Sequence, residues 1–258
     1  MIEASATTAW YVYGIAEADA ALDRLSGVGT ICRGSLAALV SEVSLEEFDE
    51  AALPERLNDR EWLERNARAH EDVLETAAAV TTVVPLRFGT IYRHPDQVAQ
   101  MLDERAEELA ATLGRVRGHI ELGVKMWADP DVIAHSLSES EAPSTGGQGA
   151  AYLQRRRQEQ ERARDLATLC ADLAGGAHAR LSAVAAAAVA NRPQPKELTG
   201  RTETMLLNGA YLVPDGDDRL RRAVEELAAE HAQLGVEYEI TGPWPPHNFA
   251  QLPEETAE

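Results

Sequence analysis

Short runs of β-branched and aromatic residues alternate with longer amphipathic stretches in this chain, and this alternation constrains the fold most strongly. Trp10–Ile15, Val28–Arg33 and Leu36–Val43 are typical of strands. Gly34-Ser35 separates the last two and predicts a two-residue hairpin turn, because glycine tolerates positive φ. Apolar residues recur every three or four positions over Asp59–Ala79, which predicts a long amphipathic helix.

A short helix predicted over Ala16–Leu25 and a buried strand predicted over Val80–Phe88 give the first half the element order β-α-β-β-α-β. From His119 the second half repeats this order, with a very long helix over residues 150–190. We therefore predict an α+β protein of two domains. The C-terminal half is expected to be ferredoxin-like with a long, partly exposed helix, and the N-terminal half a related α/β sandwich. The predicted boundaries are 1–94 for the N-terminal domain, 95–118 for a connecting helix and 119–258 for the C-terminal domain.

The charge of the chain excludes several classes of partner. Its 258 residues include 43 acidic and 24 basic side chains, a formal net charge of −19. Such a field repels nucleic acids and anionic membranes, so we expect neither as a partner. The longest apolar run, Ala183–Ala190, is too short to span a bilayer, and the first residues do not resemble an export signal. We therefore expect a cytoplasmic protein.

Residues that could carry catalysis do not form a recognisable set. His70-Glu71 begins like the zinc-protease HExxH motif, but position 74 is leucine, so the second metal ligand is missing. We expect His70 to pack at the inner face of its helix beside a carboxylate. Cys32 and Cys170 lie far apart and predict buried thiols rather than a metal cluster. The sequence therefore predicts no enzyme, no metal and no cofactor.

Two segments are not explained by the predicted elements. The first is Pro85–Tyr92, which places Arg87 at the end of an apolar strand. That arginine is either buried and paired with a carboxylate or a recognition group, and we favour the buried pair, with Glu71 or Glu75 as its partner. The second is Thr241–Phe249, in which three prolines stiffen the backbone around two aromatic residues. Those aromatics either close the C-terminal core or form a small exposed apolar site.

Six stretches of the chain together resemble the gas vesicle protein GvpF/GvpL family. They are Tyr11–Ile15, Trp62–Glu71, Val84–Thr90, Glu121–Met126, Tyr152–Arg156 and Thr241–Pro246. They occur in the family's order and cover essentially the whole chain. One difference is His247, which stands where a tyrosine is expected after the prolines.

The resemblance implies a non-enzymatic accessory or minor structural protein of gas vesicles, which are hollow, gas-filled shells built mainly from the small hydrophobic protein GvpA. It implies a two-domain α+β protein with a ferredoxin-like C-terminal domain and a coiled-coil-like helical element. It also implies that GvpA and other Gvp proteins are the partners during shell nucleation. The expected location is the cytoplasm and the gas vesicle, with the gas-facing surface of the shell as one site.

A contact surface for these partners is a hypothesis at this stage. The expected partner-binding residues are Pro85, Leu86, Arg87, Phe88, Gly89, Thr90, Tyr152, Arg155, Arg156, Trp244, Pro245, Pro246 and Phe249. Structural roles are expected for Trp62, Asn66, His70 and Glu71. The alternative is a small-molecule-binding or enzymatic α+β protein with a pocket between its two halves. Such a pocket would be lined by Arg87, His70 and Glu71, with His70 reachable from solvent.

Overall fold

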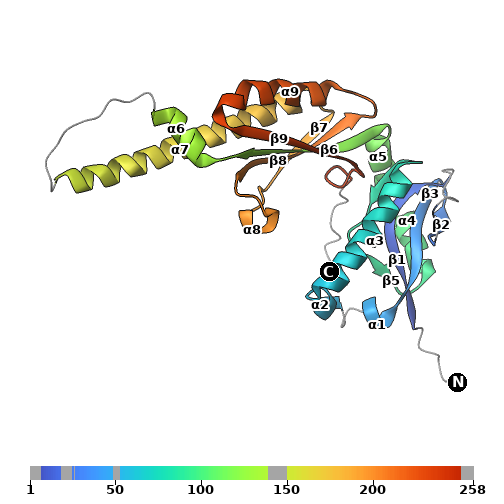
Figure 1. The fold of residues 1–258 in the computed structure, drawn as a ribbon. Helices are drawn as coiled ribbons and strands as arrows, with labels where there is room; N and C mark the ends of the chain where they lie inside the picture. Colours follow the sequence, from blue (N-terminus) through green and yellow to red (C-terminus); the bar gives the residue numbers. More distant parts are fainter. Residues whose placement is uncertain (1–6, 19–24, 26, 49–52, 139–149, 251–258) are drawn as a thin grey trace, which may run out of the picture. The chain divides into compact units, whose positions relative to one another are not determined.

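The computed structural model describes residues 7–18, 25, 27–48, 53–138 and 150–250, and for residues 53–54, 135–138, 150–155 and 158 only the backbone (Figure 1). The chain divides into two compact units. Unit 1 comprises Met1–Ile120 and Trp244–Glu258, and unit 2 comprises Glu121–Pro243. The chain therefore returns to its first unit at the end, which differs from the predicted boundaries, where everything after His119 formed one domain.

Unit 1 is built on a sheet of β1 (Thr8–Glu17), β2 (Gly29–Arg33), β3 (Leu36–Ser44), β4 (Val83–Pro85) and β5 (Ile91–Tyr92). The strand order is β2-β3-β1-β4, and β5 pairs with β1 as well. The predicted hairpin is present, because β2 and β3 are antiparallel neighbours and Gly34 has φ 55°. Gly14 on the central strand is needed for close packing, since a Cβ there would lie 2.8 Å from the carbonyl oxygen of Val84.

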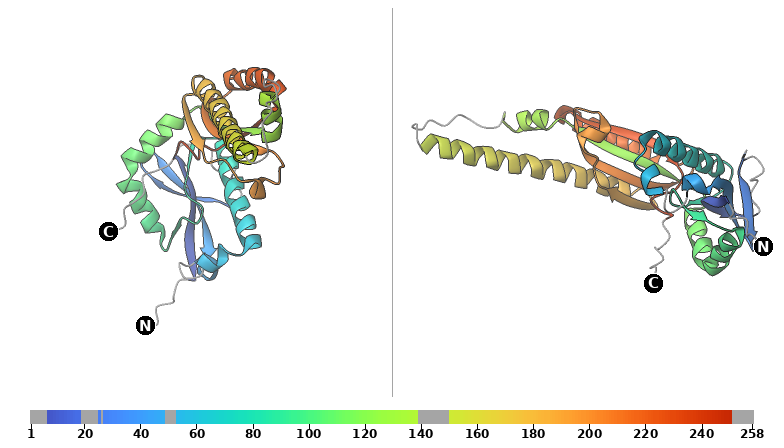
Figure 2. Two further views of the ribbon diagram at one scale, coloured as in Figure 1. Left: turned by 90° about the vertical axis from the view of Figure 1, so that its left-hand side faces the viewer. Right: turned by 90° about the horizontal axis from the view of Figure 1, so that it is seen from below.

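Helices cover both faces of this sheet. They are α1 (Leu45–Phe48), α2 (Leu53–Arg56), α3 (Arg60–Ala78), α4 (Pro95–Glu104) and α5 (Ala106–Val116). Leu74 and Ala77 of α3 pack with Leu39 on one face of the sheet. Helices α4 and α5 lie on the other face (Figure 2). Their apolar residues, such as Leu102 and Leu109, belong to the core cluster there. The stretch predicted as a connecting helix thus forms two helices, separated at Arg105, that belong to the core of unit 1.

Two local predictions in unit 1 differ from the structure. The helix predicted over Ala16–Leu25 begins inside β1, which continues to Glu17, and most of its remainder lies outside the described residues. Pairing with β3 over the full length of β1 accounts for this, since Ala16 faces Ala37 in the ladder. The strand predicted over Val80–Phe88 is limited to β4, because the chain leaves the sheet after Pro85.

Unit 2 contains β6 (His119–Ala128), β7 (Ala187–Asn191), β8 (Thr204–Pro214) and β9 (Val236–Trp244) in the order β7-β8-β6-β9. Its helices are α6 (Pro130–Ser138), α7 (Ala150–Ser182), α8 (Lys196–Thr199) and α9 (Arg219–His231), followed by the 3₁₀ turn η2 (Ala232–Leu234). With α7 and α9 as the main helices, the chain order is the predicted β-α-β-β-α-β, although its second strand, β7, lies almost entirely within the stretch predicted as helix. Both helices lie on one face of the sheet, and α8 lies on the other (Figure 1).

The long helix α7 ends earlier than predicted. It stops at Ser182, whereas the prediction extended it through the alanine-rich stretch to residue 190. Residues 187–191 instead form β7 and pair with β8, from Ala187 opposite Leu212 to Asn191 opposite Asn208. The helix propensity of alanine is a weak determinant of structure, and here the pairing of this stretch with a distant strand overrides that propensity. Near its start α7 extends past the sheet (Figure 1). The described side chains of residues 156–165 are exposed, and Leu166 is the first half-buried one.

Candidate functional site around His70 and Glu71

A bulge between β4 and β5 brings the Pro85–Thr90 motif onto the central strand. Pro85 pairs with Gly14 and Ile91 pairs with Tyr11, so residues 86–90 face only two residues of β1. Hydrogen bonds to β1 fix the first and last residues of this segment. The Leu86 N–H donates to the Tyr13 carbonyl, and the Val12 N–H donates to the Thr90 carbonyl, each at 2.9 Å. The three residues between, 87–89, therefore leave the plane of the ladder.

The bulge is fixed from within and from β1. Gly89 has φ 82°, a conformation that favours glycine. The Thr90 hydroxyl donates to the Arg87 carbonyl at 2.7 Å. The Gly89 N–H donates to the Tyr11 hydroxyl at 3.0 Å. A side chain of the central strand thus holds the turn by its backbone, so the conformation of the motif depends on the fold of unit 1.

Phe88 points from the bulge into a cluster of aromatic rings. Its ring centroid lies 6.2 Å from that of Tyr11, 6.3 Å from that of Trp62 and 5.8 Å from that of His70. Most pairs in the cluster are tilted or edge-to-face, the geometries that the quadrupoles of aromatic rings favour. The motif therefore supplies one ring to the interior of unit 1.

Helix α3 positions the other side of the cluster. Asp59 caps the helix by accepting hydrogen bonds from the backbone N–H groups of Glu61 and Trp62. With the start fixed, Trp62, His70, Leu74 and Ala77 fall on one buried face. Asn66 donates from its side-chain amide to the Trp62 carbonyl at 2.8 Å, one turn earlier.

His70 is a buried, neutral imidazole joined to the bulge. It is 3% exposed, and its Nδ1 lies 2.9 Å from the Tyr11 hydroxyl. The other ring nitrogen donates to the Leu86 backbone, so Nδ1 of the neutral ring is an acceptor, and the Tyr11 hydroxyl donates to it while accepting from Gly89. Burial lowers the pKa of His70. The partner that fixes the ring is thus the Tyr11 hydroxyl, where the sequence suggested a carboxylate.

Glu71, the next residue of α3, binds the C-terminal strap, by which we mean residues 244–250. The Nε2 of His247 lies 3.0 Å from Oε2 of Glu71. This hydrogen bond is the main cause of the lowered pKa of Glu71. Farther along the strap, Arg115 of α5 donates to the Phe249 carbonyl at 3.2 Å. The strap is therefore attached to α3 at one point and to α5 at another.

Three separate segments of the sequence thus meet at His70 and Glu71. The bulge contacts His70 through Leu86, and the strap contacts Glu71 through His247. The sequence suggested that the Pro85–Thr90 motif lies beside α3, through Arg87 and Glu71, but not that the strap joins them, and it gave Tyr11 no role. His247, the departure from the expected tyrosine, is the residue that links the strap to α3. A sequence signal for this link is absent, because Glu71 and His247 lie 176 positions apart.

The prediction of a buried Arg87 is wrong. Arg87 is exposed, because the bulge turns it outward while Phe88 turns inward. Glu71, one of its two expected carboxylate partners, is hydrogen-bonded to His247. Cys32 is also exposed rather than buried as predicted, whereas Cys170 is half-buried.

The strap combines the two alternatives that the sequence left open. Trp244 is 41% exposed, whereas Pro245 and Pro246 are buried and Phe249 is half-buried. The strap belongs to unit 1, so its buried residues pack there and not in the C-terminal core. Of the remaining predicted contact residues, Arg156 is exposed on α7, and the side chains of Tyr152 and Arg155 lie outside the description.

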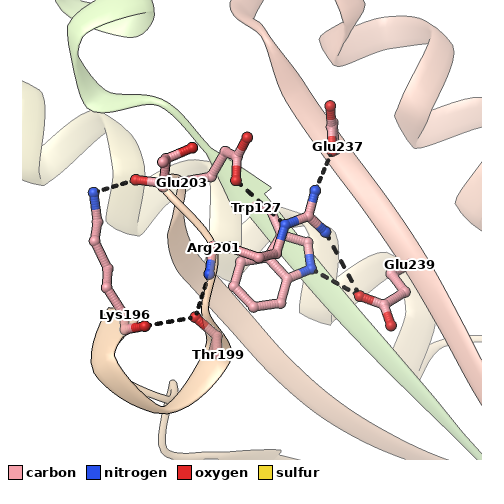
Figure 3. A network of polar contacts seen from close by, with 8 residues as sticks. Trp127, Lys196, Thr199, Arg201, Glu203, Glu237 and Glu239 are labelled. Atoms are coloured by element: carbon pink, nitrogen blue, oxygen red, sulfur yellow. Dashed lines mark hydrogen bonds and ion pairs between the residues drawn. The ribbon is translucent and has the colours of Figure 1, made fainter.

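A charged network in unit 2 was not foreseen from the sequence (Figure 3). The Arg201 guanidinium lies 4.7 Å from the ring centroid of Trp127 on β6. It also contacts carboxylates of Glu203 at 3.3 Å and, on β9, of Glu237 at 2.6 Å. The indole N–H of Trp127 donates to Glu239 at 3.2 Å. In the sequence, the alternating glutamates of β9 weakly indicate a charged face of the sheet, but nothing marks the loop residue Arg201 as part of it.

This network holds the loop that carries α8. Gly200 ends α8 with φ 66°, and the Arg201 N–H donates to the Thr199 hydroxyl at 3.4 Å. The Lys196 ammonium donates to the Thr202 carbonyl (Figure 3). Leu198, within α8, is 77% exposed. The arrangement stabilises a short helical turn on the face of the sheet opposite α7 and α9.

The described residues of both units lack the groupings of side chains that metal ions require. In the part of the chain that the structure describes, no three His, Cys, Asp or Glu side chains are grouped so as to hold a metal ion. No described helix combines the length and the apolar character that crossing a membrane requires.

The comparisons with known proteins agree with one another. The family profile described as gas vesicle synthesis protein GvpL/GvpF matches residues 9–251. Gas vesicle protein L of a Streptomyces species is 38% identical over 224 residues, which cover 86% of this chain and 82% of that protein. Gas vesicle protein F of a Streptomyces species is 29% identical over 261 residues, which cover 93% and 99%.

Two solved structures share the fold. The crystal structure of the gas vesicle protein GvpF from Anabaena sp. PCC7120 superposes with a TM-score of 0.74 at 20% identity, covering 97% of this chain and 99% of that one. The crystal structure of GvpF from Microcystis aeruginosa gives a TM-score of 0.65 at 20% identity, covering 95% and 99%. The mixed fold with two antiparallel sheets is therefore shared along almost the full length of these proteins.

Proposed function

Because the chain belongs to the GvpL/GvpF family of gas vesicle proteins, we propose that it is an accessory or minor structural protein that binds the shell protein GvpA and other Gvp proteins. In this role it supports nucleation and assembly of the gas vesicle, in the cytoplasm and at the gas-facing surface of the shell. The binding is the function, and no catalysis is involved.

Two exposed side chains on segments anchored to α3 are the contact residues that we propose. Trp244 and Arg87 are both exposed, and each belongs to a segment that is anchored to α3. Arg87 follows Leu86, which is bonded to His70, and Trp244 precedes His247, which is bonded to Glu71. Tryptophan and arginine are the side chains that contribute most often to binding energy at protein interfaces. Because both are held by a folded scaffold, little conformational entropy is lost when a partner binds.

The charge of the chain suits a partner of low solubility. A net charge of −19 keeps the complex soluble while an apolar surface of the partner is covered. The exposed indole of Trp244 supplies apolar contact area without the need for a large exposed apolar patch on this protein.

The test is a binding assay between the purified full-length chain and GvpA, for which we choose a pull-down with quantified recovery. Trp244→Ala is expected to reduce recovery at least about tenfold, the effect of a typical interface hot spot. The matched control is Leu57→Ala, since Leu57 is a similarly exposed apolar residue of unit 1 at 44%. Circular dichroism of both variants establishes that they are folded. Equal recovery with both variants would exclude Trp244 as a contact, and no binding by the unaltered chain would refute the proposed partner.

The enzymatic alternative lacks support from the geometry. It required His70 to be reachable from solvent beside Glu71 and Arg87. His70 is 3% exposed, and both of its ring nitrogens have hydrogen-bond partners within unit 1. Arg87 is exposed on the bulge. The three residues therefore do not form a catalytic group.

A further inference from the structure

The two edges of the sheet in unit 2 differ in how they are protected. An edge strand presents unpaired N–H and C=O groups, and charged residues and proline are common protection against pairing with another chain. On the edge strand β9, Glu237, Glu239 and Pro243 provide such protection. The opposite edge, β7, and the turn before it contain no charged side chain over residues 183–191. Within the strand itself this edge therefore lacks charge and proline, which occur only after it, at Arg192 and Pro193.

The edge β7 is also accessible. Ala190 is exposed and the other four residues of the strand are half-buried. Among the described strands β7 pairs with β8 alone. In an antiparallel pair, alternate residues of an edge strand direct their N–H and C=O groups away from the neighbour. These groups provide a template for one more strand.

Helix α7 carries an exposed glycine, Gly175, on its flank away from α9. His178 lies 2.9 Å from the Tyr211 hydroxyl of β8, and Arg180 binds Glu226 and Glu230 of α9, so the two residues define opposite flanks. Gly175 lies one turn before His178 and therefore on the flank away from α9. It is exposed, and a Cβ added there would meet nothing within 4 Å. Glycine destabilises a helix interior, and no contact within the chain requires it here.

We propose that β7 pairs antiparallel with β7 of a second copy of this chain, which joins the two sheets across a twofold axis. The α7 helices then approach each other at Gly175, where the absence of a side chain permits close contact. A second copy fits because antiparallel pairing of identical strands generates twofold symmetry. The charge supports the same occupant. In a chain of net charge −19 most surfaces repel a second copy, whereas this uncharged edge places no like charges opposite each other.

The first test is sedimentation equilibrium of the full-length chain over a range of concentrations. Ala190→Lys introduces an edge charge at an exposed position and is expected to weaken dimerisation at least about tenfold. The matched control is Ala229→Lys, the same change at an exposed position of α9, which is expected to leave the dimer unchanged. Hydrogen exchange of the dimer is expected to slow at alternate amides of β7.

A second variant separates the interface from the fold. Gly175→Gln is expected to raise the Tm of the monomer, because glutamine favours helix over glycine, and to weaken the dimer, because its side chain occupies the contact. A purely structural role of Gly175 would not give these opposite changes. A chain that stays monomeric at every concentration, or a dimer unaffected by both Ala190→Lys and Gly175→Gln, would overturn the proposal. Protection of the β7 amides only when another Gvp protein is added would assign the edge to that protein instead and equally overturn it.

Discussion

Replacing Tyr11 by phenylalanine removes one oxygen atom that joins three segments of unit 1. The hydroxyl accepts from the Gly89 N–H at 3.0 Å and donates to Nδ1 of His70 at 2.9 Å. Phenylalanine keeps the ring and its contacts with Phe48 and Phe88, so the change isolates the two hydrogen bonds. Both partners are left without their hydrogen bond in a mostly buried environment.

The expected loss follows from the cost of unpaired buried polar groups. Each costs about 1–3 kcal/mol, so with two such groups we expect Tyr11→Phe to lower the free energy of unfolding of unit 1 by about 2–6 kcal/mol. The matched control is Tyr13→Phe, which removes one hydrogen bond to the Ser41 hydroxyl at 2.9 Å in a partly exposed site. Because water can replace that bond, the expected loss is about 0.5–1.5 kcal/mol.

Urea titration read by hydrogen exchange on peptides from β1 and α3 measures unit 1 separately from unit 2, because each unit contributes its own peptides. The amide of Gly89 is expected to exchange faster in Tyr11→Phe and at an unchanged rate in Tyr13→Phe. Equal losses of stability in the two variants, or an unchanged exchange rate at Gly89, would refute the role assigned to the Tyr11 hydroxyl.

Three further predictions concern the strap, two glycines and the network of unit 2. His247→Ala is expected to lower the free energy of unfolding by about 0–1 kcal/mol at neutral pH. Because the pKa of Glu71 is lowered in the fold, this stabilisation is present above pH 4.5, the ordinary pKa of a glutamate, and is lost as the pH falls through the lowered pKa. The unfolding curves of the two proteins should therefore converge in acid. Gly14→Ala should destabilise by about 1–3 kcal/mol, since its Cβ meets a β4 carbonyl at 2.8 Å, whereas Gly114→Ala in α5, with open space around it, should stabilise by about 0.5–1 kcal/mol in the same urea titration. Arg201→Ala should increase cleavage of the α8 loop by a protease while leaving the rest of unit 2 resistant; unchanged cleavage would show that the network does not hold the loop.

Local patterns in the sequence determined the kinds of element and their order. The run over Asp59–Ala79 predicted α3 because an amphipathic helix needs only a repeat of 3.6 residues, with a cap such as Asp59 before it. Gly34-Ser35 predicted the β2–β3 hairpin because a two-residue turn depends on φ at those positions. In unit 2 the strands β6, β8 and β9 and the helices α7 and α9 followed in the same way, but β7 did not. Each of these properties is set by neighbours in the chain.

The tertiary structure decided what depends on residues far apart. The stretch 187–191 is alanine-rich and reads as helix, but pairing with β8 makes it a strand. Arg87 is exposed and not buried as expected, because hydrogen bonds of Leu86 and Thr90 with β1 close a bulge around it. The strap belongs to unit 1 because Glu71 and Arg115 bind it. The physical reason is the same throughout: periodicity fixes which face of an element is apolar, whereas hydrogen bonds and close packing between distant segments fix which partner that face meets.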